Sequence, residues 1–262
     1  GMKAAMFAHD MLLAGTHDVM VAGGMESMTN APYLLQKGRG GYRLGHDRIF
    51  DHMMLDGLED AYEPGRSMGT FGEDCAAKYG FTRAEQDAFA TASVERAKAA
   101  TASGAFAAEI TPVTVKSRAG ETVVSVDEGP GKVKLDKIAS LKPAFKKDGT
   151  ITAASSSSIN DGAAALVMMR ASTATKLGCK PLARIVGHAT HAQEPEWFAT
   201  APLGATQKAL AKAGWAVGDV DLWEINEAFA VVPMALMQEL NLPHDKVNVY
   251  GGACALGNPN GA

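Results

Sequence analysis

The sequence predicts an α/β fold whose regular alternation of helices and strands is interrupted by a long insertion. A helix followed by an apolar strand opens the chain, within residues 1–29. After residue 160, short apolar strands alternate with helices that end at glycine, a pattern typical of layered α/β folds. Between these parts, residues 30–159 look different, and residues 37–66 within them lack clear strand periodicity. We therefore expect this insertion to lie over the main sheet.

The first elements are a helix over residues 2–14, ended by Gly15, and a buried strand over residues 18–22. Gly23 and Gly24 follow the strand, and this pair predicts a tight turn.

One helix inside the insertion is strongly marked. Thr82 and Glu85 form a capping-box pattern, and an alanine-rich run follows to Ala102 before Gly104. Two short strands are expected at residues 113–116 and 122–126. A lysine-rich loop comes next, which suits either phosphate binding or, more commonly, a solvated face; its members are Lys132, Lys134, Lys137, Lys142, Lys146 and Lys147.

The alternation after the insertion defines the remaining elements. The predicted helices cover residues 172–177, 203–213 and 228–240. The predicted strands cover residues 163–169, 182–186, 221–225 and 247–250.

Composition narrows the function classes. The net charge of −4 argues against a nucleic-acid partner, and no apolar run approaches the length of a membrane span. Cys75, Cys179 and Cys254 are odd in number and widely spaced, so neither a disulfide framework nor a zinc site is expected. This cysteine usage favours a reducing, cytoplasmic location and no metal.

Two polar stretches are candidate binding segments. Asn226 follows the predicted strand 221–225, where its amide could hold a water or a carbonyl oxygen, although position alone favours a cap of the next helix. The run from Ser155 to Ser158 could bind an amide-bearing ligand or form a flexible linker.

The glycine-dense segment from Gly251 to Ala262 is the most informative stretch. Glycines of this kind bring backbone N–H groups close to a reacting atom. A phosphate loop is excluded, because Asn258 and Pro259 stand where Lys and Ser or Thr are required. Cys254 lies between alanines and is interpreted as a packing residue.

Taken in order, several motifs resemble those of the thiolases, in particular acetyl-CoA acetyltransferases and 3-ketoacyl-CoA thiolases. The resemblance spans the whole chain. It rests on residues 21–32 (VAGGMESMTNAP), 54–58 (MLDGL), 65–69 (GRSMG), 157–165, 226–230 (NEAFA) and 251–262.

The resemblance implies a layered α/β/α/β/α thiolase fold with two similar halves and an inserted loop domain, here incomplete. Residues 1–29 and 160–180 would form part of the N-terminal half, residues 30–159 the loop domain over the coenzyme A site, and residues 181–262 part of the C-terminal half.

The resemblance also implies reversible Claisen chemistry on coenzyme A thioesters, with an acyl-CoA substrate and no prosthetic group. Asn226 matches the residue that holds an oxyanion-hole water. The implied substrate contacts are Leu58, Met68, Phe145, Ser157, Ala228 and Phe229. A homodimer or homotetramer is the implied assembly of the full-length protein.

Three departures from the family pattern concern catalysis. Asn258 occupies the position of the family histidine, and an amide cannot take a thiol proton. By the resemblance, the two catalytic cysteines fall before Gly1 and beyond Ala262. We therefore expect an inactive internal fragment of a thiolase; the alternative is a degenerate thiolase-like protein that binds coenzyme A without catalysis.

Overall fold

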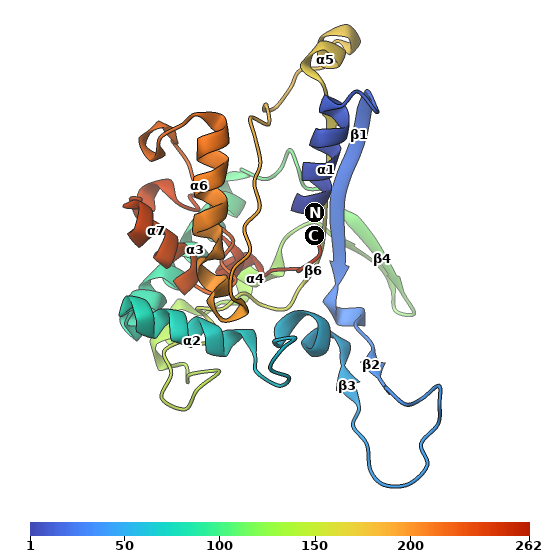
Figure 1. Cartoon of the computed structure of the whole chain (residues 1–262), viewed down its shortest axis with the longest axis vertical. Helices are drawn as coiled ribbons and strands as arrows, with labels where there is room; N and C mark the ends of the chain where they lie inside the picture. Colours follow the sequence, from blue (N-terminus) through green and yellow to red (C-terminus); the bar gives the residue numbers. More distant parts are fainter.

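The computed structural model describes residues 1–262 and divides into a long β-ribbon and a group of helices (Figure 1). Strands β1 (Val19–Ser27) and β6 (Asp161–Met169) form the ribbon, and helix α1 (Met2–Leu13) packs beside it. Four helices gather on the other side: α2 (Met68–Tyr79), α3 (Arg83–Ser103), α6 (Ala201–Ala213) and α7 (Val231–Leu240). The two chain ends lie close together between the parts. The N-terminal amino group donates to the Gly261 carbonyl oxygen at 3.1 Å.

Strands β1 and β6 pair antiparallel along their whole length, from Val19 opposite Met169 to Ser27 opposite Asp161. The predicted turn at Gly23 and Gly24 is wrong, because β1 continues through both glycines. Glycine is required at both positions because backbone atoms of other segments approach them closely. A Cβ on Gly23 would collide with the Ala164 carbonyl, and one on Gly24 would collide with the Gly261 carbonyl.

Most of the regular structure in the insertion is helical. Helix α3 (Arg83–Ser103) has the expected capping box between Thr82 and Glu85, and Gly104 ends it at φ 73°. The other elements of the insertion are η1 (Met28–Asn30), β2 (Tyr33–Leu34), β3 (Phe50–Asp51), η2 (Met54–Leu58), α2 (Met68–Tyr79), β4 (Val113–Ser117), β5 (Gly120–Val124), α4 (Glu128–Lys132) and η3 (Leu135–Ser140).

The lysine-rich stretch is more ordered than a loop, because α4 ends at its first lysine, Lys132, and η3 lies within it. Arg83 of α3 holds η3 in place by donating to the carbonyl oxygens of Ile138 and Leu141, both at 3.0 Å.

The predicted helices of the C-terminal part are confirmed with small shifts of their ends. Its elements are α5 (Ala171–Leu177), η4 (Pro195–Thr200), α6 (Ala201–Ala213), η5 (Val217–Asp219), α7 (Val231–Leu240), η6 (His244–Lys246) and α8 (Ala253–Leu256). Helix α7 starts later than expected, because residues 228–230 pair with residues 155–157 instead.

Three predicted strands of this part do not form. Residues 182–186 have no strand beside them, and the segments 221–225 and 247–250 meet only at one parallel bridge, between Trp223 and Val247. Asn248 has φ 48°, so the chain leaves the extended conformation directly after Val247. Strands need a neighbouring strand for their backbone hydrogen bonds, and these segments have none of useful length.

The main core lies among α2, α7 and η4, where Cys75, Ile151, Phe229 and Val231 are buried together. A second core surrounds Trp223, Ile225 and Val247. No helix has both the length and the apolar character needed to cross a membrane.

Candidate active site

The serine run is fixed against the segment that follows Asn226. Ser156 and Phe229 form an antiparallel bridge; the Ser157 N–H donates to the Ala228 oxygen at 3.0 Å, and the Ala230 N–H donates to the Ser155 oxygen at 2.9 Å. Ser155 and Ser156 are buried. The flexible-linker interpretation of these serines is therefore wrong.

Apolar side chains gather beside this pairing. The Phe145 and Phe229 rings meet edge to face with centroids 5.6 Å apart, and Met68 and Ala228 pack against the same cluster. Gly69 makes the space for Phe145, because any Cβ at this position would overlap the ring. The fold thus brings together five of the six predicted coenzyme A contacts, from four separate stretches of sequence.

Leu58 is the sixth predicted contact, and it is not among the side chains that pack on this cluster. It ends the single π-helical turn η2 and is half-buried. Its neighbour Gly57 faces the terminal segment, since a Cβ there would lie 3.1 Å from Nδ2 of Asn260.

Asn226 is exposed, and its side chain makes no hydrogen bond within the protein. It does not cap helix α7, which starts at Val231 with Ala230 in the N-cap position. The helix-cap interpretation is therefore wrong. Asn248 fixes the backbone before Asn226, accepting from the Ile225 N–H and donating to the Ile225 oxygen, both at 2.8 Å.

The terminal segment lies against the serine run. The Asn258 N–H donates to the Ser158 oxygen at 3.1 Å, and Asn160 Nδ2 donates to the Leu256 oxygen at 3.0 Å. The Asn258 amide reaches only Asn260, at 3.4 Å. The backbone of Asn258, at the family histidine position, is thus hydrogen-bonded to Ser158, the residue after Ser157.

Glu227 is a buried neighbour of Asn226 that sequence reasoning missed. Its side chain is fully buried and has no Lys or Arg partner. Oε2 accepts from Ser93 Oγ at 2.7 Å and from the Cys254 N–H at 3.0 Å, while Oε1 accepts from Asn248 Nδ2 at 2.8 Å. The sequence does contain a pattern that indicates burial of Glu227, because Trp223, Ile225 and Glu227 occupy alternating positions, all three of which are buried.

Neither of the two buried cysteines has the environment of a nucleophile. Burial raises the pKa of the Cys75 thiol to about 11. Burial next to Glu227 raises the pKa of the Cys254 thiol well above its usual range. Cys179 is exposed in the turn after α5. At neutral pH the two buried thiols are protonated, and the thiolate is the reactive form.

The lysines near Phe145 fall into two groups. Lys146 pairs with Asp74 at 2.7 Å. Lys142 and Lys147 are exposed and have no ion pair, and they flank Phe145 in sequence. They are free to meet anionic groups of a ligand.

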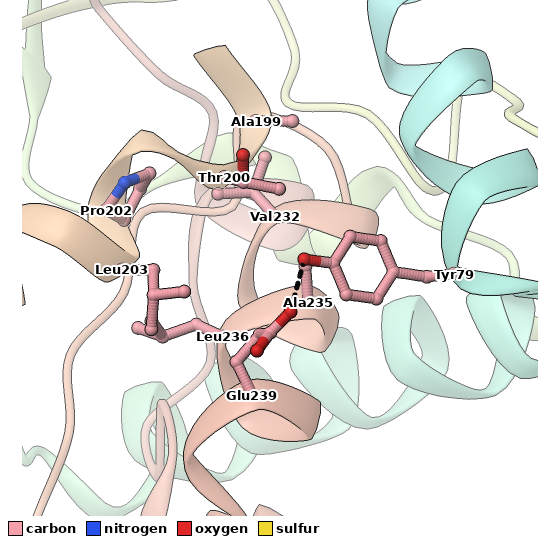
Figure 2. A pocket seen from close by; sticks show the side chains of 9 residues that line it. All are labelled: Tyr79, Ala199, Thr200, Pro202, Leu203, Val232, Ala235, Leu236 and Glu239. Atoms are coloured by element: carbon pink, nitrogen blue, oxygen red, sulfur yellow. Dashed lines mark hydrogen bonds between the residues drawn. The ribbon is translucent and has the colours of Figure 1, made fainter. Parts of the chain in front are cut away.

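Two pockets of the structure are lined by other residues. Figure 2 shows one of them, between α2, α6 and α7, where Tyr79 O–H donates to Glu239 at 2.7 Å across an apolar lining. The other has a volume of about 350 Å³ and lies between α1, α6 and residues 185–189. Neither cavity is lined by a predicted site residue.

Comparison with known families gives matches along nearly the whole chain. The model described as "Thiolase, N-terminal domain" matches residues 1–172, and the model described as "Thiolase, C-terminal domain" matches residues 179–262.

Individual relatives agree. The "Acetyl-CoA acetyltransferase" of Chromobacterium violaceum is 48% identical over 264 residues, covering 100% of this chain and 67% of the relative. "Acetyl-CoA acetyltransferase 2" of Arabidopsis thaliana is 49% identical over 264 residues, covering 100% of this chain and 65% of the relative. The chain thus spans only part of the length of these relatives.

Solved structures confirm the predicted α/β fold class. The structure of acetyl-CoA acetyltransferase from Syntrophomonas wolfei superimposes with a TM-score of 0.94 at 41% identity, over 100% of this chain and 67% of that one. The crystal structure of the Bacillus anthracis acetyl-CoA acetyltransferase superimposes with a TM-score of 0.94 at 42% identity, over 99% of this chain and 66% of that one.

Proposed function

Because the chain belongs to the thiolase family, we propose that it binds the coenzyme A part of an acyl-CoA substrate for acetyl-CoA acetyltransferase chemistry. That chemistry is the reversible Claisen condensation of two acetyl-CoA molecules, or thiolysis of a 3-ketoacyl-CoA. The observation that carries the proposal is the convergence of Met68, Phe145 and Phe229 with Ser157 at one place.

The chemistry of this cluster suits a pantetheine chain. The half-buried faces of Met68 and Phe145 offer apolar contact for its methylene groups. Ser157 Oγ donates to the Ala228 oxygen at 3.2 Å, which leaves its own lone pairs to accept an amide N–H. The exposed ammonium groups of Lys142 and Lys147 supply positive charge for phosphates. We also assign Leu58 to this site, on the basis of the resemblance alone.

Two amides are assigned to the reacting end of the thioester. Asn226 would hold a water or the thioester oxygen, since its exposed side chain has no partner within the protein. Donors of this kind stabilise the negative charge that develops on the oxygen in acyl transfer. Asn258 can donate in the same way but cannot take a proton from a thiol.

We further propose that this 262-residue chain binds coenzyme A without turning it over. Asn258 provides no general base, and burial keeps the Cys75 and Cys254 thiols protonated. This also favours the alternative of a degenerate, non-catalytic coenzyme A-binding protein, which uses the same residues.

The proposed division into partial halves and a loop domain is supported by one pairing. Residues 1–29 contribute β1 and residues 160–180 contribute β6, and these strands form one ribbon although residues 30–159 separate them in sequence.

The test is a calorimetric titration of the purified chain with coenzyme A and acetyl-CoA, together with a thiolysis assay on acetoacetyl-CoA. We expect saturable binding by the parent chain. Phe145→Ala should raise Kd about tenfold, because it removes an apolar face, and Ser157→Ala should raise Kd by less. Phe106→Ala is the control, because that ring packs on Tyr250 away from the cluster. Absence of saturable binding by folded protein refutes the binding proposal, and thiolysis above background refutes the proposed inactivity.

A further inference from the structure

Two imidazoles and a carboxylate meet where α1 faces the chain segment before α6. His9 and Asp10 belong to α1, and His188 belongs to the extended segment after α5. His188 Nε2 lies 2.8 Å from Asp10 Oδ1, and His9 Nδ1 lies 3.3 Å from the same oxygen. The three atoms all lie within 4.8 Å of one another.

The surrounding structure holds these side chains in position. The two rings pack edge to face with centroids 5.1 Å apart. The His188 backbone is fixed from α6, because Lys212 Nζ donates to its carbonyl oxygen at 2.9 Å. The side chain of His9 is only 17% exposed, so it has little freedom to turn away.

The same atoms have the chemistry of metal ligands. Two ring nitrogens and one carboxylate oxygen suit a divalent transition metal, whereas Mg²⁺ and Ca²⁺ prefer oxygen ligands alone. Zinc binds such atoms at about 2.0–2.2 Å, and one ion between these three reaches all of them with small side-chain shifts.

A route for an ion exists. His9 and His188 both line the cavity of about 350 Å³ between α1 and α6, whose other walls include Met6 and Ile185. Three protein ligands beside an open cavity leave a fourth position for water or another small ligand.

We propose that His9, Asp10 and His188 form a binding site for one divalent transition-metal ion, with Zn²⁺ as the probe. The site is independent of the proposed coenzyme A site, with which it shares no residue. The sequence gives no hint of it, because Asp10 and His188 are 178 positions apart. Zinc would tie α1 to the segment that leads into α6.

The experiment is a Zn²⁺ titration of the full 262-residue chain, by calorimetry and by competition with a chromogenic chelator. We expect one equivalent bound, and affinity lowered at least about tenfold by His188→Gln and by Asp10→Asn. Glutamine keeps a hydrogen-bond donor near Asp10, so this variant should remain folded. His46→Ala, in an exposed loop, is the matched control and should bind as the parent does.

A second readout is the melting temperature. Zinc should raise Tm in the parent and in His46→Ala but not in His188→Gln, because only a ligand that prefers the folded state stabilises it. Equal affinity and equal Tm shift in all these proteins, or no binding at micromolar Zn²⁺, would overturn the proposal.

Discussion

Buried carboxylates without a cationic partner are the most unusual residues of this protein. Glu227 is held by Ser93, Asn248 and the Cys254 N–H. Glu73 is held in the same way, accepting from the backbone N–H groups of Thr150 and Ile151. A buried charge is tolerated only when hydrogen bonds satisfy it. Each of these carboxylates therefore fixes a loop, and the loop held by Glu227 leads to Asn258.

Glu227→Gln should lower the free energy of unfolding by about 1–3 kcal/mol. Glutamine keeps one accepting oxygen and replaces the other with an NH₂ group. In one orientation this NH₂ would face the NH₂ of Asn248, and in the other it would face the Cys254 N–H. Asn248 cannot flip to accept, because both ends of its amide are bound to the Ile225 backbone. Urea denaturation monitored by circular dichroism measures the change.

The control for this variant is Glu95→Gln, since Glu95 is exposed on the same helix as Ser93 and forms no ion pair. It should change stability by less than about 0.5 kcal/mol. Equal losses in the two variants would contradict the role assigned to the Glu227 hydrogen bonds.

At the scale of elements, helices with local end signals follow the sequence closely, whereas only some of the predicted strands form. Helix α3 begins and ends where the Thr82 capping box and Gly104 predict. The segments 182–186, 221–225 and 247–250 have strand-like composition but form no ladder. A helix satisfies its own backbone, while a strand depends on a partner that may be far away in the chain.

Thr82→Ala should destabilise the protein by about 1 kcal/mol, because it removes the side-chain acceptor for the Glu85 N–H. The melting temperature and the urea midpoint should both fall. Thr82→Ser is the matched control, since its hydroxyl can make the same bond and should retain most of the stability. A Ser variant as unstable as the Ala variant would show that the cap is not the cause.

At the scale of the whole molecule, the β1–β6 ribbon exposes a row of large apolar side chains. Val21 and Val167 are paired across the ribbon and are 71% and 68% exposed. Val19 and Met25 are exposed on the same face of β1 as Val21. Contiguous apolar surface of this kind favours self-association.

We predict that the chain self-associates at micromolar concentration and that Val21→Lys combined with Val167→Glu shifts it to smaller species. The two introduced charges are opposite in sign and directly opposite each other, so the strand pairing is preserved. Size-exclusion chromatography with light scattering measures the shift. Leu182→Lys, in the isolated extended segment, is the control and should leave the size distribution unchanged. A monomeric parent protein would contradict the prediction.

The sequence by itself determined the α/β class, the helices and the family, because these depend on local periodicity, end signals and motifs read along the chain. Only the tertiary structure decided which strands find partners, that Gly23 and Gly24 lie inside a strand, and that Asn226 does not cap a helix. It also decided that Phe145 meets Phe229 and that His9 meets His188. These outcomes depend on contacts between residues far apart in sequence, and such contacts leave no local periodic trace.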